Sequence, residues 1–150
     1  MTQTFSPSLY ETPFYSLLLS YSDSHFIVKG RLLNGLSKTT QIPQTSQLLE
    51  QYLPQIFSCS CFNDANIPFS QELQQTELGH LLEHILLEFL CKEKLSHGAT
   101  SAVFDGVTKW YVDTPQEFEI FISKDKYDLP LFAQALKRSL FVFDKIISTP

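Results

Sequence analysis

The sequence contains few cysteines, and none of them forms a pair with the C-x-x-C spacing of zinc and redox sites. Cys59 and Cys61 form a C-x-C pair, and Cys91 stands alone further along the chain. A zinc site built from cysteine ligands is therefore not expected. We expect the three thiols to be reduced and the protein to be cytoplasmic.

Long hydrophobic runs are also missing from the sequence. No apolar run reaches the length of about 18 residues that a membrane-spanning helix requires. The N-terminal stretch MTQTFSPSLYETPF lacks the basic start and the apolar centre of a signal peptide. We therefore expect no association with a membrane.

Basic residues are in the minority. The chain has 11 Lys and Arg against 16 Asp and Glu, which gives a formal net charge of -5. This balance argues against a nucleic-acid partner, because such proteins carry clusters of basic residues. An acidic surface is compatible with a cationic substrate.

Hydrophobic residues, in contrast, are plentiful. They make up 43% of the chain and include 13 Phe, which is typical of a globular protein. The length of 150 residues suits one compact domain over residues 1–150. Within it, residues 1–13 contain two prolines and are expected to form a loose lead-in.

Hydrophobic periodicity and turn residues predict an α+β domain, in which helices pack on an antiparallel or mixed sheet. The predicted elements are strands at 14–21 and 25–33, a helix at 47–57 that Pro54 kinks or shortens, a short helical turn at 71–75, a central helix from the cap Thr76 to about Lys94, strands at 99–104 and 107–112 around a hairpin turn at Asp105-Gly106, a strand at 117–123, and a last helix after the cap Asp128.

The central helix carries the most informative pattern. Residues 76–90, TELGHLLEHILLEFL, place His80 and His84 one helical turn apart, so that both point the same way, with Glu83 at the edge of that face. The spacing is H-x-x-E-H, the inverted form of a zinc-protease signature. Two such imidazoles can bind one Zn²⁺ or another divalent ion, and Glu83 can act as general base on water.

The third metal ligand is less clear from the sequence. Glu88 lies one turn beyond His84 and is our first candidate, although roughly 12 Å of helix separates it from His80. Glu88 could instead hold the ring of His84 by its other N–H. In that case Glu72, Glu77 and His97 are the candidates for the third ligand.

A simpler interpretation is an amphipathic helix with its polar residues in solvent. The many leucines around the motif leave little room for such a solvated face. Gly79, just before His80, indicates close packing, either of another element of the chain or of a substrate backbone.

The stretch GHLLEHILLEFL, with the turn at 69–75 before it and a glycine-bearing loop after it, resembles the N-terminal domain of cyanophycin synthetase. The resemblance runs in order and spacing from about Cys59 to Asp144, more loosely before that, and includes His80, Glu83, His84 and Glu88. It implies a metal-dependent hydrolase that cuts cyanophycin, a poly-aspartate chain bearing arginines, into primers.

The sequence differs from that family after the loop glycine. Gly98 is followed by Ala99, Thr100 and Ser101, where the family carries basic residues. The ATP-grasp and ligase regions of the family lie outside these residues, so we expect a stand-alone relative or an excised domain. The alternative function is a non-catalytic binding or scaffolding module, which would hold an acidic or arginine-rich polymer or another copy of itself. A third possibility is a purely structural fragment.

Overall fold

The computed structural model describes residues 8–58, 68–125 and 128–148. Its elements are β1 (Ser8–Glu11), β2 (Tyr15–Tyr21), β3 (His25–Leu32), η1 (Thr39–Gln41), α1 (Thr45–Tyr52), η2 (Pro54–Ser58), α2 (Phe69–Glu72), η3 (Leu73–Gln75), α3 (Leu78–Ser96), β4 (Gly106–Trp110), β5 (Glu117–Ser123) and α4 (Leu129–Ile147). The predicted α+β class is confirmed.

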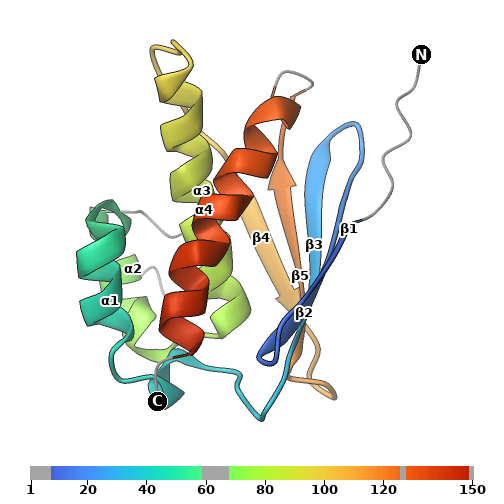
Figure 1. Ribbon diagram of the computed structural model, residues 1–150, viewed down its shortest axis with the longest axis vertical. Coiled ribbons are helices and arrows are strands. Elements are labelled where there is room, and N and C mark those ends of the chain that lie inside the picture. The colour runs from blue at the N-terminus through green and yellow to red at the C-terminus, as the bar shows by residue number, and fades with distance from the viewer. Residues whose placement is uncertain (1–7, 59–67, 126–127, 149–150) are drawn as a thin grey trace.

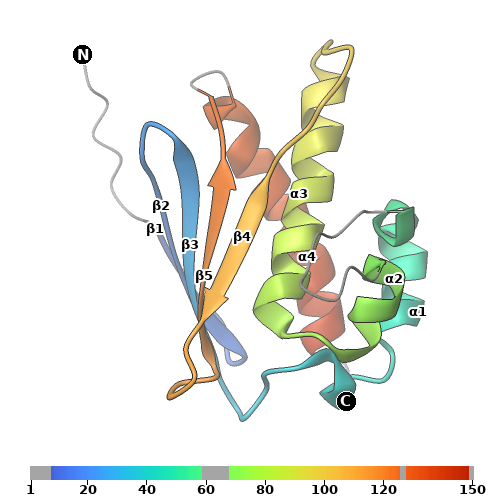
Figure 2. The ribbon, with the colours of Figure 1, turned by 180° about the vertical axis from the view of Figure 1, so that it is seen from behind.

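The strands form one antiparallel sheet in the order β1-β2-β3-β5-β4. The long helices α3 and α4 lie together on one face of this sheet, and α1 and α2 lie beyond them (Figures 1 and 2). β5 pairs with β3 on one side and with β4 on the other, so β4 forms an edge of the sheet, where it contacts α3.

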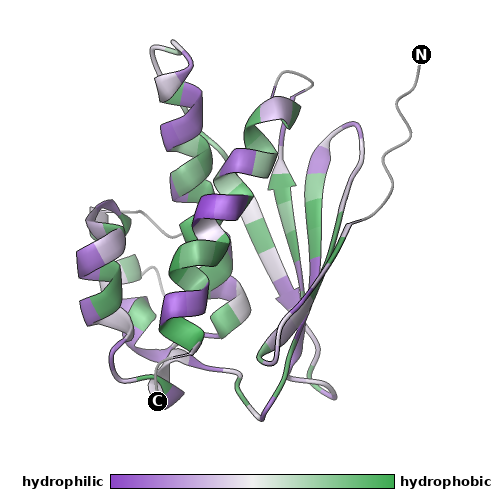
Figure 3. Cartoon of the chain, in the orientation of Figure 1, coloured by the Kyte–Doolittle hydropathy of each residue, from purple (hydrophilic) through white to green (hydrophobic). Residues whose placement is uncertain are grey.

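Alternation along the strands places the core between the sheet and the helices. Every second residue of β2, β3 and β5 is buried, as the pattern over residues 117–123 predicts. Along the helices, hydrophobic residues are interspersed with hydrophilic ones (Figure 3). The buried apolar side chains of the described residues form one continuous core, in which α4 is amphipathic and α3 is apolar on most sides.

Two predictions about the strands need correction, and one about a helix is confirmed. Residues 8–11 belong to the edge strand β1, which pairs with β2, so the lead-in predicted over 1–13 is wrong there. Residues 99–104 form no strand, and β4 pairs with β5 across the turn at 111–116. The predicted shortening of the helix at Pro54 is confirmed: α1 ends at Tyr52 and η2 starts at Pro54, because proline cannot donate the next helical hydrogen bond.

Phe118 explains the close packing that Gly79 indicated. A Cβ on Gly79 would lie 2.6 Å from Cγ of Phe118, and a Cβ on Gly30 would lie 2.1 Å from Cζ of the same ring. The ring of Phe118 is therefore held between β3 and α3, where only two glycines leave room for it. Another element of the chain packs here, rather than a substrate.

Within the described ranges, no helix is both long and apolar enough to cross a bilayer. Cys59 and Cys61 lie outside the described residues, and Cys91 is a free, half-buried thiol on α3.

Candidate metal centre

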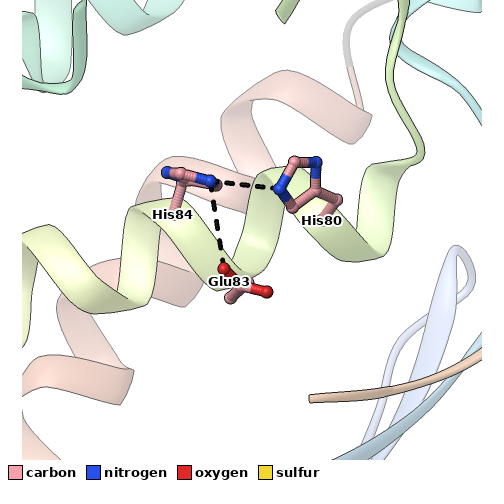
Figure 4. A group of neighbouring side chains, drawn as sticks. All are labelled: His80, Glu83 and His84. Carbon is pink, nitrogen blue, oxygen red and sulfur yellow. Dashed lines mark hydrogen bonds and ion pairs between the residues drawn. The ribbon is translucent and has the colours of Figure 1, made fainter. Parts of the chain in front are cut away.

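His80, Glu83 and His84 come together on the N-terminal half of α3 (Figure 4). One possible ligand atom from each of the three residues lies within 4.8 Å of the other two. The two rings point toward one another across one turn, and a carboxylate oxygen of Glu83 lies 3.9 Å from Nε2 of His84. Helical spacing alone produces this convergence, as the motif predicts.

The distance between the two imidazoles fits a shared ion. Nε2 of His80 and Nε2 of His84 lie 3.1 Å apart, and their rings are nearly perpendicular at 76°. Two nitrogens bound to one tetrahedral zinc ion at about 2.0–2.1 Å lie about 3.3 Å apart. The two nitrogens are hydrogen-bonded to each other at 3.1 Å, and this separation is close to the one that a shared ion would require.

The other nitrogen of His80 is held by neighbouring polar groups. Nδ1 lies 2.9 Å from Oγ1 of Thr76 and 3.6 Å from a carboxylate oxygen of Glu72. When Nδ1–H donates to these oxygens, the lone pair of Nε2 is directed toward His84. Thr76 was predicted as the cap of the helix, but Glu77 is the N-cap residue, and Thr76 orients His80 instead.

Phe69 of α2 closes the other side of the cluster. Its ring stacks on His84 at a centroid distance of 3.9 Å and meets His80 edge-on. His84 is buried, and this burial, together with the charge of His80, lowers the pKa of His84 to about 3. His84 is therefore neutral near pH 7, which is the form that binds a metal ion.

Glu83 is positioned by the edge strand β4. Oγ1 of Thr108 donates to one carboxylate oxygen at 2.6 Å, while the other oxygen is the one directed at His84. Gly106 packs against the carboxylate, since a Cβ there would lie 3.1 Å from Cγ of Glu83. Burial raises the pKa of Glu83, and the hydrogen bond from Thr108 partly opposes this shift.

The sequence around this cluster matches one known family. The family model of the cyanophycin synthase-like N-terminal domain matches residues 30–112, more than half of the chain. The chain belongs to this family. Among curated proteins, none matches the sequence.

The cyanophycin synthase-like segment holds every residue of the cluster and its supports. It starts inside β3 and ends just after β4, so it includes α2, α3 and the strand that carries Thr108. The matched segment begins well before Cys59 and ends well before Asp144. The resemblance described from the sequence was closest between those two residues. The matched segment therefore includes the elements that build the candidate centre, together with η1, α1 and η2.

The other predicted ligands lie outside the group of three. Glu88 is half-buried one turn further along α3, where its charge helps to raise the pKa of Cys91. His97 caps the end of α3, with Nδ1 2.7 Å from the backbone oxygen of Glu93. Glu77 is the N-cap residue of α3, so of the candidates from outside the motif only Glu72 approaches the cluster.

Two supporting residues were not predicted from the sequence. Thr108 approaches Glu83 only because β4 packs on α3, and no local pattern marks that contact. Phe69 lies 15 positions before His84 and reaches it through the fold of α2. The bond from Thr76 to His80 joins residues only four positions apart, but Thr76 lies before α3 in extended backbone, so helical spacing does not account for it.

Proposed function

We propose that this domain is a metal-dependent hydrolase of peptide or isopeptide bonds, and that its substrate is a cyanophycin-like polymer bearing arginines. The observation that carries the proposal is the 3.1 Å approach of two imidazole nitrogens beside a buried carboxylate. Membership of the cyanophycin synthase-like family and the net charge of -5 support a cationic polymer as the substrate.

His80 and His84 would hold the ion through Nε2, because the 3.1 Å between these two nitrogens is close to the separation of about 3.3 Å at one tetrahedral ion. Zinc suits this set of donors, although other divalent ions accept it too. Such an ion, when bound, supplies a Lewis acid that makes water far more acidic. Thr76 and Glu72 keep the ring of His80 in the ligating orientation.

Glu83 would be the general base. One of its oxygens is occupied by Thr108, so the other, which faces His84, is the atom that accepts the proton of an attacking water. Its raised pKa makes it a better proton acceptor than an exposed carboxylate. The same carboxylate then donates this proton to the leaving amine.

The third protein ligand stays a prediction. Glu88 is the first candidate, and its alternative role is to hold His84 by the second ring nitrogen. Replacing Glu88 with Ala distinguishes the two roles. If Glu88 is a ligand, the variant loses one protein bond to the ion. If Glu88 holds His84, the variant keeps its ligands and binds the ion about 10–100-fold more weakly.

Two substitutions test the proposal. Glu83→Gln should retain the metal of the purified protein and lower the hydrolysis of an arginine-bearing poly-aspartate by at least about 10²-fold, the contribution of a general base. His80→Ala should lose the metal. Metal analysis and release of amines are the measurements, and equal metal content in wild type and His80→Ala contradicts the proposal.

A second candidate function is a non-catalytic module that binds the polymer or a second copy of the domain. The observation that favours it is burial, since the side chains of His84 and Glu83 are only 5% and 6% exposed. This module would bind the polymer equally well with and without divalent ions and would release no product. The same assays therefore distinguish the two functions.

A further inference from the structure

The strand β4 lies at the end of the sheet, beside the candidate centre. Its one strand neighbour is β5, and Thr108 from this strand donates to Glu83. Sheet edges carry backbone groups that are free to pair with another chain. The edge of β4 therefore has both the hydrogen-bonding capacity and the position to hold a chain next to the cluster.

The phase of the β4–β5 ladder determines which backbone groups are available. The N–H of Ser123 donates to the carbonyl of Asp105 at 2.8 Å, which makes these two residues a hydrogen-bonded pair. Such pairs alternate along an antiparallel ladder. In the register of β4 and β5, the odd-numbered residues of β4 therefore bond to β5, and the even-numbered residues direct their N–H and C=O groups outward.

The three outward-directed residues are Gly106, Thr108 and Trp110. The side chains of Thr108 and Trp110 lie on the same face as those of Ile120 and Ile122, that is, toward the helices and the cluster. Backbone pairing at this edge would therefore place a peptide alongside the Thr108–Glu83 hydrogen bond.

Exposed hydrophobic residues gather along the same strand and its flanks. Of the large hydrophobic side chains that are exposed in the described chain, half lie between residues 103 and 112, namely Val103, Val107, Trp110, Tyr111 and Val112. Edge strands of soluble proteins are commonly protected by charges, prolines or bulges. β4 has only Lys109, whose Nζ lies over the ring of Phe121, so its outer edge is poorly protected.

The charges around this edge are mainly negative. Asp105 and Asp113 are exposed at the two ends of β4, and Glu72 and Glu83 lie at the cluster. A chain that pairs with β4 would therefore meet an exposed carboxylate near each end of the strand. This pattern is complementary to basic side chains.

We propose that the outer edge of β4 binds the substrate, an extended peptide main chain with basic side chains, as an additional strand of the sheet. The proposal rests on the proposed function for the nature of the substrate and adds the way in which it is held. Main-chain pairing would supply affinity, and every second side chain of the peptide would point toward α3. A bond in the paired segment would then lie beside Glu83.

Amide hydrogen exchange tests this binding mode directly. The probe is a poly-aspartate heptamer with arginine on each β-carboxyl, added to metal-free Glu83→Gln protein so that no turnover occurs. We expect the amides of Gly106, Thr108 and Trp110 to exchange fast in the free protein and at least tenfold more slowly with the heptamer. The amides of Val107 and Lys109, already bonded to β5, should change little. Unchanged exchange at the three outward amides overturns the proposal.

Two variants of Trp110 separate the backbone from the side chain. Trp110→Ala keeps the N–H and removes the indole, whereas Trp110→Pro removes the N–H, which points away from β5 and is not needed by the sheet. Trp110→Pro should bind the heptamer at least tenfold more weakly than Trp110→Ala. Slow exchange at Val107 and Lys109 checks that β4 is still paired in both variants. Equal affinities of the two variants contradict strand addition.

A second copy of the domain is the competing occupant of this edge. If the free protein is a dimer in sedimentation and its outward amides are already protected, the edge serves self-association and the proposal is wrong. Failure of the proposed function is seen separately, since protection by the heptamer without hydrolysis by wild type removes the hydrolase and leaves the strand pairing intact. Hydrolysis without protection overturns the strand pairing alone.

Discussion

At the scale of single residues, the centre depends on side chains that hold other side chains. One carboxylate oxygen of Glu83 faces the cluster, and the other is held by Thr108. In the same way, Nε2 of His80 faces the cluster, and Nδ1 is held by Thr76. Residues that orient a reacting group commonly determine whether it is placed well enough to act. The first prediction therefore concerns a residue whose side chain contacts Glu83 rather than the ion.

Replacing Thr108 with Val removes the hydroxyl that donates to Glu83 and keeps the volume of the side chain. We expect kcat to fall by at least about tenfold, because the carboxylate loses the bond that aims its other oxygen. Metal content should be unchanged, since Thr108 does not approach either imidazole. Thr108→Ser keeps the hydroxyl and is the control, and a loss of activity as large as that of Val would contradict the assigned role.

The candidate site shows which residue-scale features a sequence can reveal. His80, Glu83 and His84 were predicted because helical spacing alone brings them to one face. Thr108 lies 25 positions from Glu83, and only the packing of β4 on α3 connects them. Contacts between distant elements leave no periodic signal in the sequence, so the role of Thr108 could not be predicted.

At the scale of the elements, α3 is positioned by the ring of Phe118. The ring fills the space over Gly79 and Gly30, so the helix approaches the sheet closely just before His80. The cluster thus starts next to the contact between Gly79 of α3 and Phe118 of β5. Changes at this contact should act on stability rather than on the chemistry of the side chains.

Gly79→Ala should destabilise the domain by about 1–3 kcal/mol, the cost of overpacking a core. At a helix position with space around it, Gly→Ala stabilises a protein by about 1 kcal/mol. The direction of the change in the free energy of unfolding therefore shows whether Gly79 is crowded. Urea unfolding is the measurement. In a Phe118→Ala background the penalty should shrink, because most of the clashing atoms are gone, and an unchanged penalty would show that the ring is not the cause.

Tyr15 connects the sheet to α4. Its hydroxyl donates to Asp144, and the ring packs on Phe143 at a centroid distance of 5.5 Å. Burial raises the pKa of Tyr15 well above its ordinary value, and the carboxylate of Asp144 adds to the shift. The folded state therefore keeps this proton at pH values at which the unfolded chain loses it.

Tyr15→Phe should cost about 1–2 kcal/mol near pH 7, the contribution of a hydrogen bond to a charged group that is exposed on one side. The advantage of the wild type is fully present below about pH 10 and falls as the pH rises above it, by at most about 1.4 kcal/mol per pH unit. Unfolding of both proteins between pH 7 and 11 measures this difference, and an advantage that stays constant to pH 11 would contradict the account.

The types of most elements could be predicted, but the strand β1 and the irregular course of residues 99–104 could not. Alternation over residues 117–123 predicted β5 at its observed bounds, because one face of that strand is buried. β1, in contrast, has a burial pattern with exposed side chains and only β2 beside it, so no hydrophobic face marks it. The Asp105-Gly106 dipeptide indicated a hairpin, yet the residues before it run along α3, where Cys91 contacts the carbonyl of Ala102.

At the scale of the whole molecule, the domain is a sheet with one covered and one open face, and the centre lies between the helices and the edge strand. Composition predicted the class, since abundant apolar residues and separated helical and strand patterns favour α+β packing. The strand order was not predictable, because it depends on β5 returning beside β3 after the whole of α3. That return is what places β4 next to Glu83.

A ligand that binds only the folded centre should stabilise the whole domain. Zinc at about 100 times its dissociation constant should add about 2.7 kcal/mol to the free energy of unfolding. For a domain of this length the corresponding rise in Tm is about 5–10 °C. Calorimetry with and without zinc measures the shift, and His84→Ala is the matched control, in which the rise should disappear. A rise of the same size in that variant would mean that zinc binds elsewhere.

The most direct test of the central claim is X-ray absorption at the zinc edge of the loaded protein. If His80 and His84 bind one ion, the spectrum will show two imidazole nitrogens at about 2.0–2.1 Å together with oxygen ligands, and His84→Ala will show one fewer imidazole. A wild-type spectrum with one imidazole or none, or one that His84→Ala leaves unchanged, would contradict the claim that these two rings share a metal ion.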